Sequence, residues 1–287
     1  MATGIVSVAA RFQGLPVLSD VLLAVAVLGW LALSAAACPR LLRRPRLESF
    51  AFVAATGVLG ARLSFAGHDL VALALWALAI AGWIVLLARR PHLTRADGGW
   101  FLVVVGTESL AVLASPLALR FGDELLPAAL VWWALGLVLY PVVAAAIAVE
   151  LRRRARFGPD LWITMGALAI VTLAGTELLD AVRAAHSLGA FRPVLRDVDI
   201  VTWATASAWI APLLAAEARN RAGWHYRSSR WSFVFPLGMY AVATQTLGSV
   251  AHLGPLADLA HVFFTGALLA WALTFSGLVK VALARPW

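Results

Sequence analysis

The sequence predicts an all-α membrane protein with ten transmembrane helices, and three observations support this fold class. Of the 287 residues, 62% are apolar and only 13% are charged, whereas soluble domains have roughly 45–50% and 25%. Long apolar stretches recur along the whole chain, and short charged segments separate them. The basic residues of these segments alternate between two sides, as they do in multi-pass membrane proteins. A soluble globule is excluded, because so little charge cannot cover so much apolar surface.

Nine stretches are long enough to cross a bilayer, which takes about 17–25 apolar residues. Helices are favoured over barrel strands, because the stretches are rich in Leu and Ala and do not alternate in polarity. Met1–Ala10 precedes them and is too short to span, so we expect a truncated first helix. The nine spans are Leu15–Ala37, Phe50–Ala66, Leu70–Ala88, Trp100–Leu119, Leu125–Val149, Leu161–Val182, Val198–Ala216, Trp231–Ala251 and Leu256–Ala284.

The basic residues orient these spans. One set of connecting segments, together with the C-terminal end, holds 17 of the 23 Lys and Arg residues, and the opposite set holds six. By the positive-inside rule the richer side is cytoplasmic, and the C-terminus lies there. The net charge of +8 is therefore an orientation signal, and its arginines contact lipid headgroups. No nucleic-acid partner is expected.

Alternate stretches share a pattern that indicates a repeat. Each has an aromatic residue near its cytoplasmic end and a small residue further in, except for Met1–Ala10, which has only the second. The intervening stretches are rich in Leu, Ala and Val, with tryptophans near their ends, which is typical of lipid-facing helices. Five similar hairpins predict an inner ring of five helices inside an outer ring of five. The recurrent glycines either let helices pack closely or line a lumen; they are Gly4, Gly57, Gly106, Gly166 and Gly238.

Three segments carry distinctive motifs: MATGIVS at 1–7, FGPDLWITMGALAI at 157–170 and RWSFVFPLGMY at 230–240. They resemble the first, seventh and ninth helices of the tellurite-resistance/dicarboxylate transporter family, which includes plant slow anion channels and fungal malate permeases. The resemblance covers essentially the whole chain. It implies a single domain over residues 1–287, with five helical hairpins in quasi-fivefold symmetry around a central pore. It also implies a homotrimer in the plasma (inner) membrane.

The resemblance implies transport of small anions: halide or nitrate, C4-dicarboxylate, or oxyanions such as tellurite or sulfite. Either a channel or a proton-coupled carrier fits. Phe235, immediately before Pro236, matches the family's phenylalanine that plugs the pore. A rigid aromatic in a narrow apolar lumen blocks hydrated ions, and a proline kinks the helix that carries it. The alternative is an aromatic that packs beside a structural kink.

Glu108 is the clearest ionisable side chain at membrane depth, where such groups are functional candidates. A carboxyl that binds and releases a proton suits proton coupling. Alternatively Glu108 faces a neighbouring helix, because it lies about 140° around the helix from the position that aligns with Phe235. Glu177 and Asp180 are most simply interfacial. No cofactor or metal site is indicated, and an intramembrane enzyme is not favoured, because the serines have no histidine in mid-span.

Overall fold

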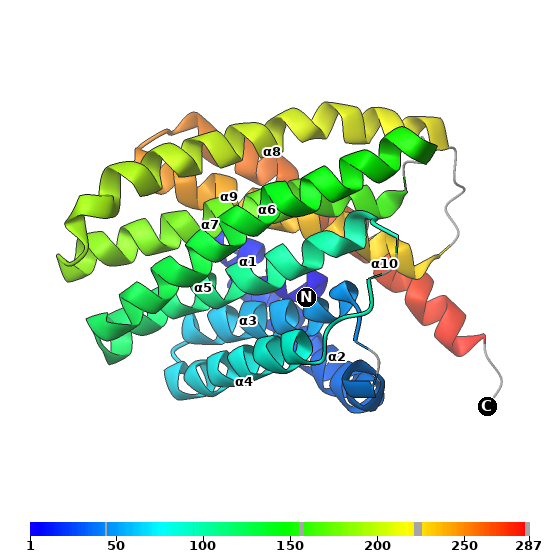
Figure 1. The fold of residues 1–287 in the computed structure, drawn as a ribbon, viewed down its shortest axis with the longest axis horizontal. Coiled ribbons are helices and arrows are strands. Elements are labelled where there is room, and N and C mark those ends of the chain that lie inside the picture. Colours follow the sequence, from blue (N-terminus) through cyan, green and yellow to red (C-terminus); the bar gives the residue numbers. More distant parts are fainter. Residues whose placement is uncertain (44, 94, 155–157, 221–225, 285–287) are drawn as a thin grey trace.

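In a computed structural model the chain forms ten α-helices, with no strand among the described residues 1–43, 45–93, 95–154, 158–220 and 226–284. Phe157 of the second motif and the predicted cytoplasmic Arg44, Arg156, Arg221 and Arg285 lie outside those ranges. Figure 1 shows many of the helices running roughly along the long axis, with α4 and α8 at opposite edges of the view and the N-terminus near its middle.

Odd-numbered helices form an inner ring and even-numbered helices an outer one, as predicted. The inner helices are α1 (Ala2–Phe12), α3 (Ala51–Ser64), α5 (Leu102–Phe121), α7 (Trp162–Ala185) and α9 (Trp231–Ala251). Each contacts the next, and α9 contacts α1, which closes the ring. The outer helices, each packed on the inner helix before it, are α2 (Pro16–Arg43), α4 (Asp69–Ala88), α6 (Leu126–Arg154), α8 (Arg192–Asn220) and α10 (Pro255–Leu283).

Burial separates the two rings clearly. In the apolar spans that contain α5, α7 and α9, 67 to 94% of residues are buried inside the protein, against 11 to 22% in the five outer helices. Within the described residues, eight helices are long and apolar enough to cross a membrane. The remaining two are α1 with 11 residues and α3 with 14. Helices suit lipid because most of their backbone hydrogen bonds lie within the segment.

Most helices begin and end within a few residues of the predicted limits, and α8 differs most. It begins at Arg192, six residues before the predicted Val198. The prediction excluded Arg196 and Asp197 because they are charged, but charged residues are compatible with a helix that continues beyond the apolar core. Pro193 favours an earlier start, because its fixed φ suits the first turn.

Indole hydrogen bonds tie the rings together and repeat around the fold. A tryptophan of each outer helix donates to the inner helix of the following hairpin, and the last such bond returns from α10 to α1. The same type of contact therefore occurs once in each of the five hairpins, as quasi-fivefold symmetry requires. It also shows that these tryptophans of the outer helices point inward. The five bonds are Trp30 to Thr56 Oγ1 (3.0 Å), Trp83 to Thr107 Oγ1 (2.9 Å), Trp133 to Val171 O (3.2 Å), Trp203 to Thr244 Oγ1 (3.0 Å) and Trp271 to Thr3 Oγ1 (3.0 Å).

Candidate functional site

A narrow cavity lies at the centre of the inner ring. All five inner helices contribute to its wall, which is apolar except for one carboxylate. Its volume is about 10 Å³, room for no more than about one water molecule. The centre of the inner ring is therefore closed mainly by apolar side chains. The lining residues are Ile5, Val8, Val58, Ala61, Phe65, Val112, Ile170, Leu173, Glu177, Met239 and Val242.

A wider vestibule of about 420 Å³ adjoins this narrow cavity at the C-terminal ends of α1, α3, α7 and α9. Phe65 and Glu177 line both spaces, so they mark the boundary between them. The rings of Phe12 and Phe65 lie 5.6 Å apart at this level. The rest of the vestibule wall is mostly polar and comes from α7 and α9: Thr176, Asp180, Gln245, Thr246, Ser249 and Val250.

Hydrogen bonds hold the polar wall of the vestibule in place. The hydroxyls of Thr176 and Thr246 lie 3.0 Å apart and connect α7 to α9. The amide of Gln13, just after α1, donates to Gln245 Oε1 at 3.3 Å. The Oε1 of Gln13 lies 2.9 Å from Nδ1 of His261 on α10. These hydrogen bonds connect α7 with α9 and connect the end of α1 with α9 and α10, so helices and not loops fix the wall of the vestibule.

The five recurrent glycines share one environment. At each, a neighbouring inner helix or the turn before it is so close that a β-carbon would meet it within 3.2 Å. Small residues permit such close approach of helices. None of the five is among the residues that line the two cavities. The contacts favour the packing role, and a pore-lining role stays a prediction. The pairs are Gly4 with Val58, Gly57 with Ser109, Gly106 with Phe50, Gly166 with Pro236 and Gly238 with Ile5.

Phe235 lies in α9 one turn before the narrow cavity and is fully buried. Met239 and Val242, which line that cavity, follow Phe235 at i+4 and i+7, a spacing that shares one helix face. Phe235 therefore continues the cavity-lining face toward the N-terminal ends of the inner helices. Pro236 follows within the helix and packs against Gly166 of α7.

Glu108 lines neither cavity. It is fully buried, and both its carboxylate oxygens are without a hydrogen-bond partner among the described residues. A β-carbon on Gly136 of α6 would collide with its Oε1, so the side chain points toward that outer helix. Asp199 on α8, which sequence reasoning missed, is similarly buried and unpartnered, and it lies against Gly175 of α7. Glu108 therefore points toward a neighbouring helix, but among the described residues it lacks the hydrogen bond to Thr or Ser that we expect of a structural role. Its role in proton coupling stays a prediction.

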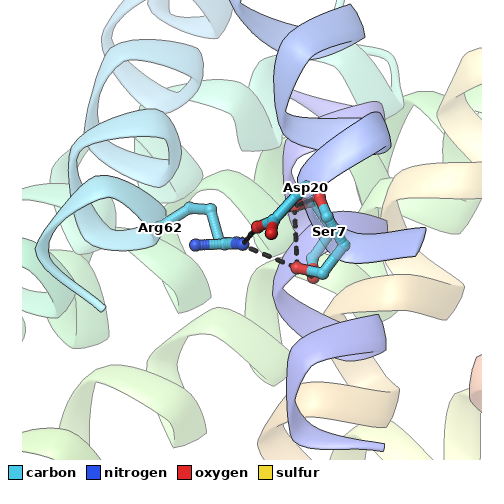
Figure 2. Close-up of polar contacts among 4 residues, drawn as sticks. Ser7, Asp20 and Arg62 are labelled. Atoms are coloured by element: carbon cyan, nitrogen blue, oxygen red, sulfur yellow. Dashed lines mark hydrogen bonds and ion pairs between the residues drawn. The ribbon is translucent and has the colours of Figure 1, made fainter. Parts of the chain in front are cut away.

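Arg62 on α3 is a buried cation behind the wall of the narrow cavity. Its Nε donates to Ser7 Oγ (3.1 Å) and Ser19 Oγ (3.0 Å). Its Nη2 donates to Asp20 Oδ1 (2.6 Å), so the cluster joins α1, α2 and α3 (Figure 2). Sequence reasoning counted Arg62 only as an orienting charge at a helix end. The one signal for its role was Asp20, an acidic residue inside an apolar span.

Within the described residues, no group of three or more His, Cys, Asp or Glu side chains is placed to hold a metal ion. Residues 1–279 match the family described as voltage-dependent anion channel. Two uncharacterized membrane proteins of Mycobacterium tuberculosis, from strains CDC 1551 / Oshkosh and ATCC 25618 / H37Rv, are each 35% identical over 146 residues. The alignments cover 48% of this chain and 67% of each relative. The family match extends over all three motifs and confirms the predicted resemblance.

Proposed function

The chain belongs to the voltage-dependent anion channel family, and we propose that its anions cross the membrane between the five inner helices. Members of this family are anion channels or transporters, so this multi-pass membrane protein transports anions. One observation supports the route: the narrow cavity takes lining residues from every inner helix. Among the described residues no outer helix contributes to it.

We propose that this path opens and closes at an apolar constriction gated by Phe235. Apolar constrictions gate by excluding water, and the narrow cavity already has room for only about one water molecule. Phe235 extends the same face of α9 by one turn. Pro236 removes a backbone hydrogen bond from this turn, which leaves the helix freer to reorient the ring.

We also propose the setting of the pathway. The 17 basic residues on one side favour an inner-membrane orientation in which the C-terminus is cytoplasmic. The vestibule then opens to the outside. The outer helices turn most of their apolar residues away from the protein, which suits lipid and the contacts of a homotrimer. Small anions are the expected cargo, and the path needs neither a cofactor nor a nucleic-acid partner.

The proton-coupled carrier remains an alternative prediction. A proton bound at Glu108 would act from behind the pore wall, through the contact of α5 with α6, because Glu108 lines neither cavity. Flux that carries protons in the wild type and not in Glu108→Gln would favour this carrier. Anion current without proton movement would favour the channel.

The gate is tested by anion flux in proteoliposomes. Phe235→Ala should raise chloride conductance severalfold, because it removes the ring that continues the constriction. Phe233→Ala is the matched control: it deletes a ring two residues earlier that packs edge-on against Trp162, at 4.4 Å between centroids. Unchanged flux in a folded Phe235→Ala protein, or an equal rise in both variants, would contradict a specific gate.

A further inference from the structure

We propose that Asp199 on α8 is a proton-binding site within the membrane, that it exchanges its proton with the vestibule, and that release of this proton raises anion flux. Asp199 lines neither cavity, so the site lies behind the pore wall and not in it. The binding of the proton stands on the burial and contacts of Asp199 alone. Only its effect on flux rests on the proposed path between the inner helices.

The Asp199 side chain lacks the usual partners of a buried carboxylate. It is 0% exposed, and neither of its carboxyl oxygens has a hydrogen-bond partner among the described residues. The hydroxyls of Thr172 on α7 and Thr202 on α8 lie 2.8 Å apart and bond to each other and to backbone oxygens. An ionised carboxylate without partners is costly at membrane depth, and the neutral acid is much less so. Asp199 therefore holds a proton.

No cation forms an ion pair with Asp199 within the described part of the chain. Arg183 of α7 donates from Nη1 to a backbone oxygen of α9 at 3.2 Å. Arg192 of α8 donates from Nη2 to a backbone oxygen of α7 at 3.2 Å. Glu108 of α5 is close enough for the two carboxyl groups to repel each other when both are ionised. The other charged or titratable side chains of α7, α8 and α9 are Glu177, Asp180, Arg196, Asp197, Glu217, Arg219 and Tyr240.

Gly175 places Asp199 directly behind the vestibule. A β-carbon on Gly175 of α7 would collide with Asp199 Oδ1, so the carboxyl packs against bare backbone. The next residue, Thr176, lines the vestibule. One turn of α7 thus has the acid on one face and the vestibule on the other. Glu108 lacks such a neighbour, because it points toward the outer helix α6 and neither residue beside it in the chain lines a cavity. The exchanging proton is therefore assigned to Asp199.

The proton on Asp199 also affects the pore wall. Helix α7 contributes Ile170, Leu173 and Glu177 to the narrow cavity, and α8 packs on α7 where Asp199 meets Gly175. Loss of the proton leaves a desolvated charge in this helix contact. The charge favours separation of the two helices, because water can then reach the carboxylate. Ionisation of Asp199 should therefore loosen α7 and raise the flux of anions along the proposed path.

Infrared spectroscopy of the full chain in lipid tests the site directly, because the C=O stretch of a carboxylic acid is separate from that of a carboxylate. At pH 7 the wild type should show an acid band that weakens in Asp199→Asn. The part that is lost should shift when H₂O is replaced by D₂O, and the part that Glu108→Gln removes should shift more slowly. Asp20→Asn is the matched control: this carboxylate is 69% exposed and paired with Arg62, so the acid band should not change.

Chloride flux into proteoliposomes, measured from about pH 5 to about pH 10, tests the effect on transport. Wild-type flux should rise with pH as Asp199 ionises. Asp199→Asn stays neutral, so its flux should stay at the wild-type level of low pH throughout the range. Flux with the same pH dependence in both proteins overturns the control of transport by Asp199.

The infrared outcomes decide the site separately. An acid band that is unchanged in a folded Asp199→Asn protein overturns the proton site. A band that is lost in this variant but does not shift in D₂O overturns exchange with the vestibule. If neither the wild type nor Phe235→Ala conducts any anion, the proposed path fails and the effect on flux falls with it, while the infrared result still decides the site. If Asp199→Asn does not fold, Asp199→Ala removes the same acid and leaves space beside Gly175.

Discussion

Arg62 on α3 and Asp20 on α2 form an ion pair whose two ends differ greatly in exposure. The guanidinium is 1% exposed and the carboxylate 69%, although Arg62 Nη2 and Asp20 Oδ1 lie 2.6 Å apart. Inside the protein, the Arg62 Nε is satisfied by the hydroxyls of Ser7 and Ser19. The buried cation is thus held by hydroxyls of α1 and α2 and by an outward-facing carboxylate on α2. The Arg62 side chain therefore connects α1 and α2, which form the first hairpin, to α3 of the inner ring.

Arg62→Ala should lower the free energy of unfolding by about 2–3 kcal/mol, because hydrogen bonds to a charged group are lost and two buried serines lose a donor. Asp20→Asn should lower the free energy of unfolding by about 1 kcal/mol or less, since the Asp20 carboxylate is largely exposed and its ion pair is screened. Thermal unfolding in detergent measures both. Equal losses in the two variants would mean that the surface ion pair, and not the buried hydroxyl contacts, holds the hairpin.

Gly57 in α3 sets the distance between two inner helices. A β-carbon there would lie 2.7 Å from Ser109 Oγ and 2.9 Å from the Ser109 backbone oxygen, and a backbone atom cannot rotate away. Gly57→Ala should therefore lower the free energy of unfolding by about 1–3 kcal/mol through overpacking. Unfolding of the purified protein by denaturant gives the value.

Gly29 in α2 is the matched control, because a β-carbon there would meet nothing within 4 Å. Gly29→Ala should be neutral or raise the free energy of unfolding by up to about 1 kcal/mol, since Ala has the higher helix propensity. A Gly57→Ala protein as stable as the Gly29→Ala protein would show that α3 and α5 have room to spare.

The helices were predictable because lipid imposes a continuous apolar span on each of them. For α9 the predicted and observed limits agree, Trp231 and Ala251. The start of α8 was not predictable from hydropathy, because a helix that continues at the membrane surface tolerates charged residues such as Arg196. Hydropathy reports where a helix crosses the hydrocarbon, and not where its backbone hydrogen bonds begin.

Side-chain direction across the two rings was harder to predict than helix limits. A glycine at a helix contact and a glycine at a lumen look alike in one sequence, and Gly166 is at a contact. Glu177 was predicted to be interfacial because it is near the end of its span, yet it lines both cavities. Its role depends on which neighbours the ring brings together, which local periodicity does not report.

Asp97 precedes α5 and should make stability depend on pH. Its Oδ1 accepts a hydrogen bond from Gly99 N at 2.9 Å. Burial raises the pKa of Asp97 above its ordinary value of 3.8, the nearby Asp160 and Glu48 raise it further, and backbone hydrogen bonds partly oppose this. The folded state thus binds the proton more tightly than the unfolded state. This stability is complete below pH 3.8 and is lost as pH rises through the raised pKa.

Asp97→Asn should therefore stabilise the protein at pH 7 and flatten the loss of stability between pH 3.8 and neutrality. The asparagine side chain still offers an oxygen to Gly99, so the cap of this turn is retained. Unfolding midpoints measured from pH 4 to 7 in both proteins check the sign. A variant that is less stable than the wild type at pH 7 would mean that the ionised carboxylate is needed where it lies.

The bond from Trp271 on α10 to Thr3 on α1 closes the ring, and it should be worth as much as its counterpart at another position. Combining Trp271→Phe with Thr3→Val in a double-mutant cycle should give a coupling of about 0.6 kcal/mol, the average for hydrogen bonds between membrane helices, and no more than about 1.7 kcal/mol. The pair Trp203→Phe and Thr244→Val, between α8 and α9, should give a similar value, because the two bonds occupy equivalent places and are both 3.0 Å long. Coupling at Trp203 with none at Trp271 would mean that α1 does not complete the fivefold ring in the membrane.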